Sequence, residues 1–352
     1  MEETNRDDTH ALPKGAIKTR TVVIGLVVGI PLSLLFLWLA VRGVAFDKVW
    51  DALSSANPAL VALAAPFLIA IIAFQGLRWR ALMGDDAPLP RRMYIALSYF
   101  GNGVSNVIPG RPGDVVRAVW LSRIAHLPVA RGLASVGVDR AFDVLSLVIL
   151  LLGCLPFLAH PDWLVTLAIS GATIAAALLA ILVVAWWYSH RSERGQEWIA
   201  TADERSWVSR QAAGLVRGMA TMNHIGQIVE VVAWSFMVWL SSAVGVWLLL
   251  AALDASPSPG EAVVAIVVIG LGAAIPSSPG QIGTTQWLAV VSLGVFGVSK
   301  ATALAFSVLL QALTLIPIIL AAPFIAWWLV TRKRKASTHA EDGGAPAETT
   351  SH

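Results

Sequence analysis

Long runs of apolar residues dominate the chain, and polar residues gather between them. A helix that crosses the apolar core of a bilayer, about 30 Å thick, needs roughly 20 residues of this kind. Several runs reach this length and predict transmembrane helices. They are 21–41, 58–77, 141–159, 163–187, 229–252 and 302–330. The first run is too long for a secretory signal peptide and follows a partly acidic tail, so we interpret it as a retained anchor.

Two further apolar stretches, 93–110 and 262–296, do not fit a single crossing because each contains a break rich in Pro and Gly. Proline removes a backbone donor, and glycine permits backbone angles closed to other residues, so a helix ends there. The helix breakers are Pro109, Pro112 and Gly113 in the break at 108–114, and Pro276, Pro279 and Gly280 in the break at 275–281. We expect two re-entrant hairpins, each entering and leaving the membrane by one face. The predicted fold class is an all-α integral membrane protein with about six transmembrane helices and these two broken-helix hairpins.

The two breaks resemble each other. Residues 108–121 read IPGRPGDVVRAVWL, and residues 275–288 read IPSSPGQIGTTQWL. The matching Ile, Pro, Pro, Gly, Trp and Leu are each offset by 167 positions, as from 109 to 276. An odd number of predicted spans separates the hairpins, which predicts an inverted repeat, and broken helices in such repeats mark the binding sites of transporters. Two independent proline kinks in a packed bundle are the alternative.

The composition excludes a water-soluble globule. Hydrophobic residues make up 57% and charged residues 13% of the chain, against about 25% charged residues in soluble domains. The single cysteine, Cys154, excludes an internal disulfide and a cysteine-rich metal site. The histidines are scattered, so we expect no metal site and no cofactor. A formal net charge of +3 in a membrane protein reports its orientation, not binding to nucleic acid.

The basic residues predict the topology. Only Arg42, Lys48 and Lys300 fall on one side of the predicted membrane, and the other Lys and Arg residues fall on the opposite side. The positive-inside rule then places both termini in the cytoplasm and the chain in the cytoplasmic (inner) membrane. The predicted organisation is a polar tail at 1–20, a membrane domain at 21–331 and a disordered cytoplasmic tail at 332–352.

Charged residues gather around the first break, and we expect them to form an anion site. Arg111 lies between two prolines inside the break, and its guanidinium suits bidentate binding of a phosphate. The predicted site for a lipid headgroup consists of Arg111, Arg117, Arg140, Asn102 and Asn106. Asp114, Asp139 and Asp143 are expected to form supporting charge pairs. At helical spacing, Asp143 lies beside Arg140, and Asp114 is either the partner of Arg117 or a helix cap. The alternative is that these charges are interfacial and only enforce the topology.

The second break is polar but neutral. It carries Ser277, Ser278, Gln281 and Thr284 in place of charged residues. A headgroup held at the first break could pass to this weaker site. Equally, these side chains could serve only to satisfy the broken backbone and the neighbouring helices.

Three segments together resemble a known family: 106–117, which contains the first break; 139–143, which reads DRAFD; and 276–283 in the second break. With the Arg-Trp-Arg sequence at 78–80, they are similar to the lysylphosphatidylglycerol synthase transmembrane-region family, over roughly residues 20–331. This resemblance implies a membrane domain like that of the multiple peptide resistance factor, which moves aminoacylated phosphatidylglycerol between leaflets. The aminoacyltransferase domain of full-length members is not expected here.

The sequence favours a lipid translocator that moves an anionic, phosphate-bearing lipid between the leaflets, and it favours this over an enzyme. Its expected partners are a membrane phospholipid or a polyprenyl-phosphate lipid, and a separate lipid synthase is a further candidate. One alternative is a membrane transferase with a polyprenyl-phosphate or phospholipid donor, with Asp114, Asp139 or Asp143 as the base. The other is a non-catalytic partner of a lipid synthase that docks through the loop at 188–228. No phosphate-binding loop of the Gly-x-x-x-x-Gly-Lys-Ser/Thr type occurs in the sequence.

Overall fold

The computed structural model describes residues 19–108, 112–158, 162–191, 225–255, 258–273 and 275–342. The regular elements in these ranges are helices. In chain order, they are α1 (Thr19–Val41), α2 (Phe46–Ser54), α3 (Pro58–Met83), η2 (Gly84–Asp86), α4 (Arg91–Val107), α5 (Gly113–Ile124), α6 (Val129–Cys154), η3 (Leu155–Phe157), α7 (Asp162–Arg191), α10 (Ile225–Ala252), α11 (Pro259–Gly272), η5 (Pro279–Gln281), α12 (Thr284–Gly294) and α13 (Lys300–Asp342).

The helices confirm an all-α integral membrane protein. Within the described ranges, α3, α6, α7, α10 and α13 are each long and apolar enough to cross a bilayer. The helices α1 and α2 are long and apolar enough to cross a bilayer only when taken together, as a pair bent by 82°. Large apolar side chains such as Leu34, Ile169 and Leu320 are exposed on the outer surfaces of these helices, where a bilayer would cover them.

Several helices extend beyond the apolar runs that predicted them. α3 continues past residue 77 through Arg78 and Arg80. α6 begins at Val129 and not at 141, so Asp139 lies inside the helix and not at its mouth. The hydropathy pattern ends at these charges, but the helices continue, and Arg78 and Asp139 are paired inside the protein. α13 likewise continues through 332–342, which the composition predicts to be a disordered tail.

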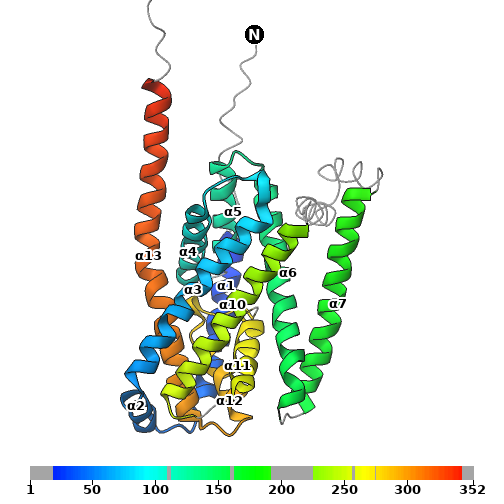
Figure 1. Cartoon of the computed structure of the whole chain (residues 1–352). Coiled ribbons are helices and arrows are strands. Elements are labelled where there is room, and N and C mark those ends of the chain that lie inside the picture. Colours follow the sequence, from blue (N-terminus) through cyan, green and yellow to red (C-terminus); the bar gives the residue numbers. More distant parts are fainter. Residues whose placement is uncertain are drawn as a thin grey trace, which may run out of the picture.

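The short helix α2 was not predicted. It carries Phe46 and Trp50 exposed to the surroundings, with Asp47 and Lys48 between them and Asp51 directly after Trp50. A short helix with apolar and charged faces is typical of the interface between lipid and water. Its place after the 82° bend puts it across the end of α1 (Figure 1).

The described helices form two halves with the same order of elements. α3, α4, α5 and α6 are followed, 167 positions later, by α10, α11, α12 and α13; α3 (58–83) shifted by 167 gives 225–250, and α10 occupies 225–252. Figure 1 shows α3 and α10 running in opposite directions, with α4 and α5 at the upper end of the bundle and α11 and α12 at the lower end. The arrangement agrees with two halves of opposite orientation.

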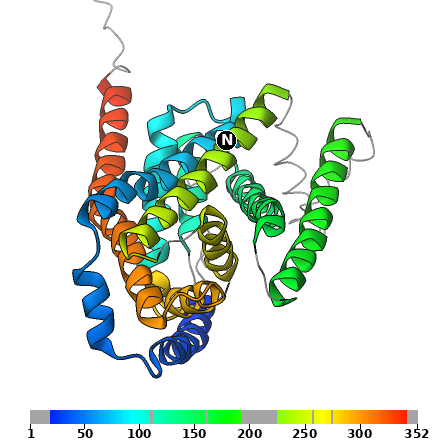
Figure 2. The ribbon, with the colours of Figure 1, turned by 60° about the horizontal axis from the view of Figure 1, so that its bottom comes forward.

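Two other helices flank these halves. α7 packs against α6 and stands at the edge of the bundle (Figure 2). α1 packs against α12 and against the second break. Its close approach depends on two glycines, because a Cβ at Gly29 would lie 2.9 Å from the Ser277 carbonyl oxygen and one at Gly283 would lie 2.1 Å from that of Ser33.

The first broken pair, α4 and α5, crosses at two glycines. A Cβ at Gly113 would lie 1.7 Å from the Gly101 carbonyl oxygen, and a Cβ at Gly101 would lie 2.9 Å from the carbonyl oxygen of Gly113. The Gly113 N–H donates to Ser105 Oγ at 3.1 Å. Gly113, predicted only as a helix breaker, therefore also provides the room for this crossing.

We predict that Gly113→Ala destabilises the protein by about 2 kcal/mol or more, because the new methyl group would overlap the backbone of α4. Thermal unfolding of the purified protein in detergent measures this effect. Gly153→Ala is the matched control, since no atom lies within 4 Å of a Cβ at this helical glycine. A melting temperature lowered equally by both substitutions would contradict the role of the crossing.

Candidate functional site

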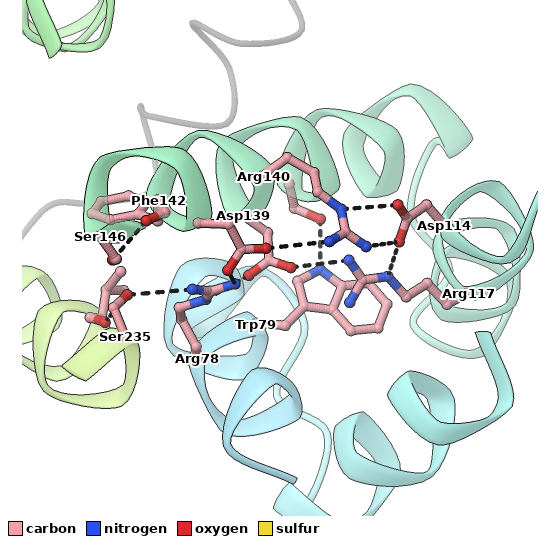
Figure 3. Close-up of polar contacts among 12 residues, drawn as sticks. Arg78, Trp79, Asp114, Arg117, Asp139, Arg140, Phe142, Ser146 and Ser235 are labelled. Carbon is pink, nitrogen blue, oxygen red and sulfur yellow. Dashed lines mark hydrogen bonds and ion pairs between the residues drawn. The ribbon is translucent and has the colours of Figure 1, made fainter. Parts of the chain in front are cut away.

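Three arginines and three aspartates from α3, α5 and α6 form a closed ring of ion pairs (Figure 3). Each arginine contacts two aspartates, and each aspartate contacts two arginines. The order around this charged ring is Arg78, Asp139, Arg117, Asp114, Arg140, Asp143 and back to Arg78. Its formal charges cancel.

The inner side of the charged ring is fully enclosed. Arg78 Nε donates to Asp139 Oδ1 at 2.7 Å, and Arg78 Nη2 donates to Asp143 Oδ1 at 2.8 Å. The side chain of Arg78 is 0% exposed and that of Asp139 is 2% exposed. Arg78 Nη1 also reaches Ser235 Oγ on α10 at 3.5 Å. Burial of these ions is tolerated because every charge has an opposite partner in hydrogen-bonding geometry.

The outer side of the charged ring joins α5 to α6. Arg117 Nη2 donates to Asp139 Oδ2 at 2.9 Å, and Arg117 Nε lies 3.0 Å from Asp114 Oδ1. Arg140 donates to both oxygens of Asp114, at 3.0 and 2.8 Å, and to Asp143 Oδ2 at 3.2 Å. The Asp114–Arg117 and Arg140–Asp143 pairs are those that the helical spacing predicts. The side chain of Arg140 is half-exposed, so the ring opens to the surroundings on this side only.

Sequence reasoning missed Arg78, the most deeply buried member of the ring. Its position at the end of an apolar run, beside Trp79 and Arg80, is typical of an interfacial charge. The structure shows this for Arg80, which is 37% exposed and 4.0 Å from Glu230, but not for Arg78. The available signal was the spacing of Asp139 and Asp143, which lie four apart on one face of α6 and can hold one guanidinium between them.

Trp79 supports the ring from one side. The guanidinium carbon of Arg117 lies 4.8 Å from the centre of its ring, in a cation–π contact. Its indole N–H donates to Ser135 Oγ at 2.8 Å, and Tyr94 meets it edge-on. The cation–π contact therefore adds to the ion pairs that position Arg117.

The predicted headgroup residues separate in the structure. Arg117 and Arg140 belong to the charged ring, whereas Asn102 and Asn106 lie on α4 outside it. The two asparagines donate to backbone carbonyls one turn earlier, those of Ser98 and Asn102, both at 2.9 Å. Arg111 and Pro109 lie outside the described residues, and Pro112 immediately precedes α5.

Asn102 and Asn106 line a partly open cavity of about 240 Å³ in the middle of the bundle. Gly280 and Gln281 of the second break and Thr285 of α12 line the same cavity. The structure thus brings α4, which leads into the first break, and the second break together around one space. The remaining walls come from α3, α10, α11 and α13.

The second break is held by a chain of amide hydrogen bonds. The Gly283 N–H donates to Gln286 Oε1 at 2.6 Å, the amide of Gln286 donates to Gln311 Oε1, and the amide of Gln311 donates to the Gly280 carbonyl at 3.0 Å. Gly280 and Gly283 have positive φ angles of 66° and 92°, and Gln281 shares this conformation. The backbone freed by Pro276 and Pro279 is therefore satisfied partly by side chains.

The other predicted residues of the second break do not line the cavity. The Ser278 N–H donates to Ser33 Oγ of α1 at 2.7 Å, and Ser278 Oγ donates to the Ile282 carbonyl at 2.9 Å. Ser277 is buried beside Gly29 of α1. Thr284 is buried, and its hydroxyl has no hydrogen-bond partner in the part of the chain that the structure describes. Of the four residues predicted for this break, only Gln281 lines the cavity.

Comparison with known proteins identifies relatives over most of the chain. The model of the family described as lysylphosphatidylglycerol synthase TM region matches residues 22–322. A protein named glycosyltransferase AglD, from Haloferax volcanii, is 25% identical over 327 residues, which cover 83% of this chain and 52% of that protein. The chain therefore spans about half the length of this relative.

Two relatives from Methanothermobacter thermautotrophicus are closer to this chain in length. Both are named UPF0104 membrane protein. One is 23% identical over 285 residues, or 74% of this chain and 82% of the relative. The other is 25% identical over 294 residues, which cover 75% of this chain and 81% of the relative.

We predict that Asp139→Asn lowers the free energy of unfolding by about 3–5 kcal/mol, because it leaves Arg78 and Arg117 buried with one carboxylate fewer. Chemical denaturation in detergent, followed by circular dichroism, measures the loss. Glu230→Gln is the control; it removes a carboxylate from the exposed pair with Arg80 and is expected to cost about 0–1 kcal/mol. Equal losses for the two variants would show that the ring does not stabilise the fold.

Proposed function

Since the chain belongs to the lysylphosphatidylglycerol synthase TM region family, we propose that it is a lipid translocator. It moves an anionic, phosphate-bearing lipid between the leaflets of the membrane. The observation that carries this proposal is the cavity that α4, the helix leading into the first break, shares with Gly280 and Gln281 of the second break. Non-helical backbone within a membrane protein is tolerated where it is buried in protein or faces a water-filled cavity, and such sites serve substrate passage.

The walls of the cavity suit the two parts of a lipid. Leu68, Ile72 and Ile318 contribute apolar surface, and Asn102 and Gln281 contribute amides. The cavity is partly open. A polar headgroup can occupy it while the acyl chains stay in the surrounding bilayer, so the tails are not transferred through a polar path.

The anionic part of the lipid needs a cation that is not already paired. Arg117 and Arg140 each contact two aspartates in the charged ring. Arg111 precedes α5 in the sequence by two residues, within the break between α4 and α5. We propose that Arg111 binds the phosphate. The charged ring then serves to hold together the helices around the site.

The orientation proposed from the sequence places both termini in the cytoplasm and the chain in the inner membrane. In Figure 1, α1 begins and α13 ends at the same end of the bundle, which supports an even number of crossings. Arg91, Arg92 and Arg123 lie on α4 and α5, at this end. The positive-inside rule then makes it the cytoplasmic end.

A membrane transferase is the second candidate function, because one relative is named a glycosyltransferase. Its catalytic base would be a carboxylate free to accept a proton. Asp114, Asp139 and Asp143 are each bound by two arginines, which favours a structural role for them. The third hypothesis is that the chain is a non-catalytic partner of a lipid synthase. It depends on the loop at 188–228, of which residues 192–224 lie outside the described ranges.

We predict that the purified protein moves fluorescent phosphatidylglycerol, aminoacylated phosphatidylglycerol or a polyprenyl phosphate across proteoliposome membranes, and that Arg111→Ala slows this at least about tenfold, since a charge-assisted contact to phosphate is lost. Quenching of the outer-leaflet dye by dithionite measures the rate. Arg123→Ala is the matched control, because it removes the same charge from α5. If no lipid moves while the protein remains folded, the translocator proposal fails, and transferase assays follow.

A further inference from the structure

The central cavity lies between the two halves of the repeat. Among the described residues, five of the eight first-half residues that line it have a counterpart 167 positions later that also lines it. The pairs are Ile72 with Trp239, Gln75 with Ser242, Tyr99 with Ile266, Asn102 with Ile269, and Asn106 with Ala273. Both halves thus present equivalent positions to one space, which is where an inverted repeat binds its substrate.

The described lining of this cavity contains no charged residue. Its polar side chains are amides, hydroxyls and one indole. They belong to Gln75, Tyr99, Asn102, Asn106, Trp239, Ser242, Gln281, Thr285, Gln311 and Thr314. An ion placed among them would lose its hydration without gaining an opposite charge, which is costly in a medium of low dielectric constant.

Part of the hydrogen-bonding capacity of the cavity is unused. The indole N–H of Trp239 is buried and has no hydrogen-bond partner among the residues that the structure describes. The side-chain amides of Gln75 and Gln281 also make no hydrogen bond to the described part of the chain. Gln311, by contrast, is committed to the backbone of the second break. Buried polar groups in native proteins are paired, so a lone buried donor beside a cavity indicates a missing acceptor.

We propose that the cavity binds the uncharged, hydroxyl-rich part of a lipid headgroup, such as a glycosyl or glycerol group. A hydroxyl group donates and accepts at once, as do the amides of Gln75 and Gln281, and it can accept from the Trp239 N–H. A bare phosphate offers only acceptors and brings a charge that nothing in the described lining neutralises. This inference rests on the proposed translocator function, since it names the chemistry of the group that is moved.

Lipid retention by the purified full chain tests the inference without measuring transport. Native mass spectrometry compares three lipids with identical acyl chains: monoglucosyl diacylglycerol, phosphatidylglycerol and phosphatidic acid. We expect the two hydroxylated lipids to be retained about tenfold better than phosphatidic acid, although one is neutral and one is anionic, because a site built for hydroxyl groups rejects ligands that lack them.

Two substitutions locate the binding. Trp239→Phe removes the unpaired N–H and keeps an aromatic ring, and Gln75→Leu removes an amide on the opposite helix α3. Each is expected to lower retention of the hydroxylated lipids by about five- to tenfold, the effect of one lost hydrogen bond. Trp327→Phe, at an exposed position of α13 outside the cavity, is the matched control and is expected to change nothing. Gln75→Leu provides a second test if Trp239→Phe does not fold.

The outcomes separate this inference from the proposed function. Equal retention of phosphatidic acid, or unchanged retention in both cavity variants, would overturn the inference even if the protein moves lipids. If the cavity variants abolish selective retention but no lipid moves in proteoliposomes, the binding site is supported and the translocator proposal is contradicted.

Discussion

The first half of the membrane domain depends on a closed ring of alternating charges. Arg78 is enclosed within the protein, and buried ions are stable only when opposite charges hold them at hydrogen-bonding distance. The ring meets this requirement for six residues, because each ion pairs with two neighbours of opposite charge. It also fixes α5, whose 12 residues are too few to cross a bilayer, by joining Arg117 and Asp114 to α6.

In the second half, neutral groups in place of ions hold the broken pair of helices together. The positions 167 residues after the ring members carry Gly245, Gln281, Thr284, Phe306, Ser307 and Leu310. No ion pair can form among these side chains. The break is instead bridged by the amides of Gln286 and Gln311, which bind Gly283 and Gly280. The halves therefore share an order of helices and differ in the chemistry that holds each broken pair, which makes the two ends of the bundle electrostatically different.

This division separates support from recognition. The arginines of the charged ring already have partners, and the described walls of the central cavity carry amides and hydroxyls. Selection at the cavity then follows from the number and direction of hydrogen bonds and not from net charge. Groups held in this way avoid the large desolvation cost of an ion at the centre of a membrane protein, which suits a site that a headgroup must both enter and leave.

The sequence by itself determined the class of protein, the positions of the long apolar helices, the two breaks and their 167-residue offset, because hydropathy and Pro-Gly breaks act locally along the chain. It also predicted the pairs of Asp114 with Arg117 and of Arg140 with Asp143, which depend only on helical spacing. Only the tertiary structure decided that Arg78 closes the ring, that the helices continue through their charges, and that Asn102 and Gln281 share a cavity with Trp239. These features join residues up to about 180 positions apart. Burial and pairing across such separations arise from packing, which no local pattern encodes.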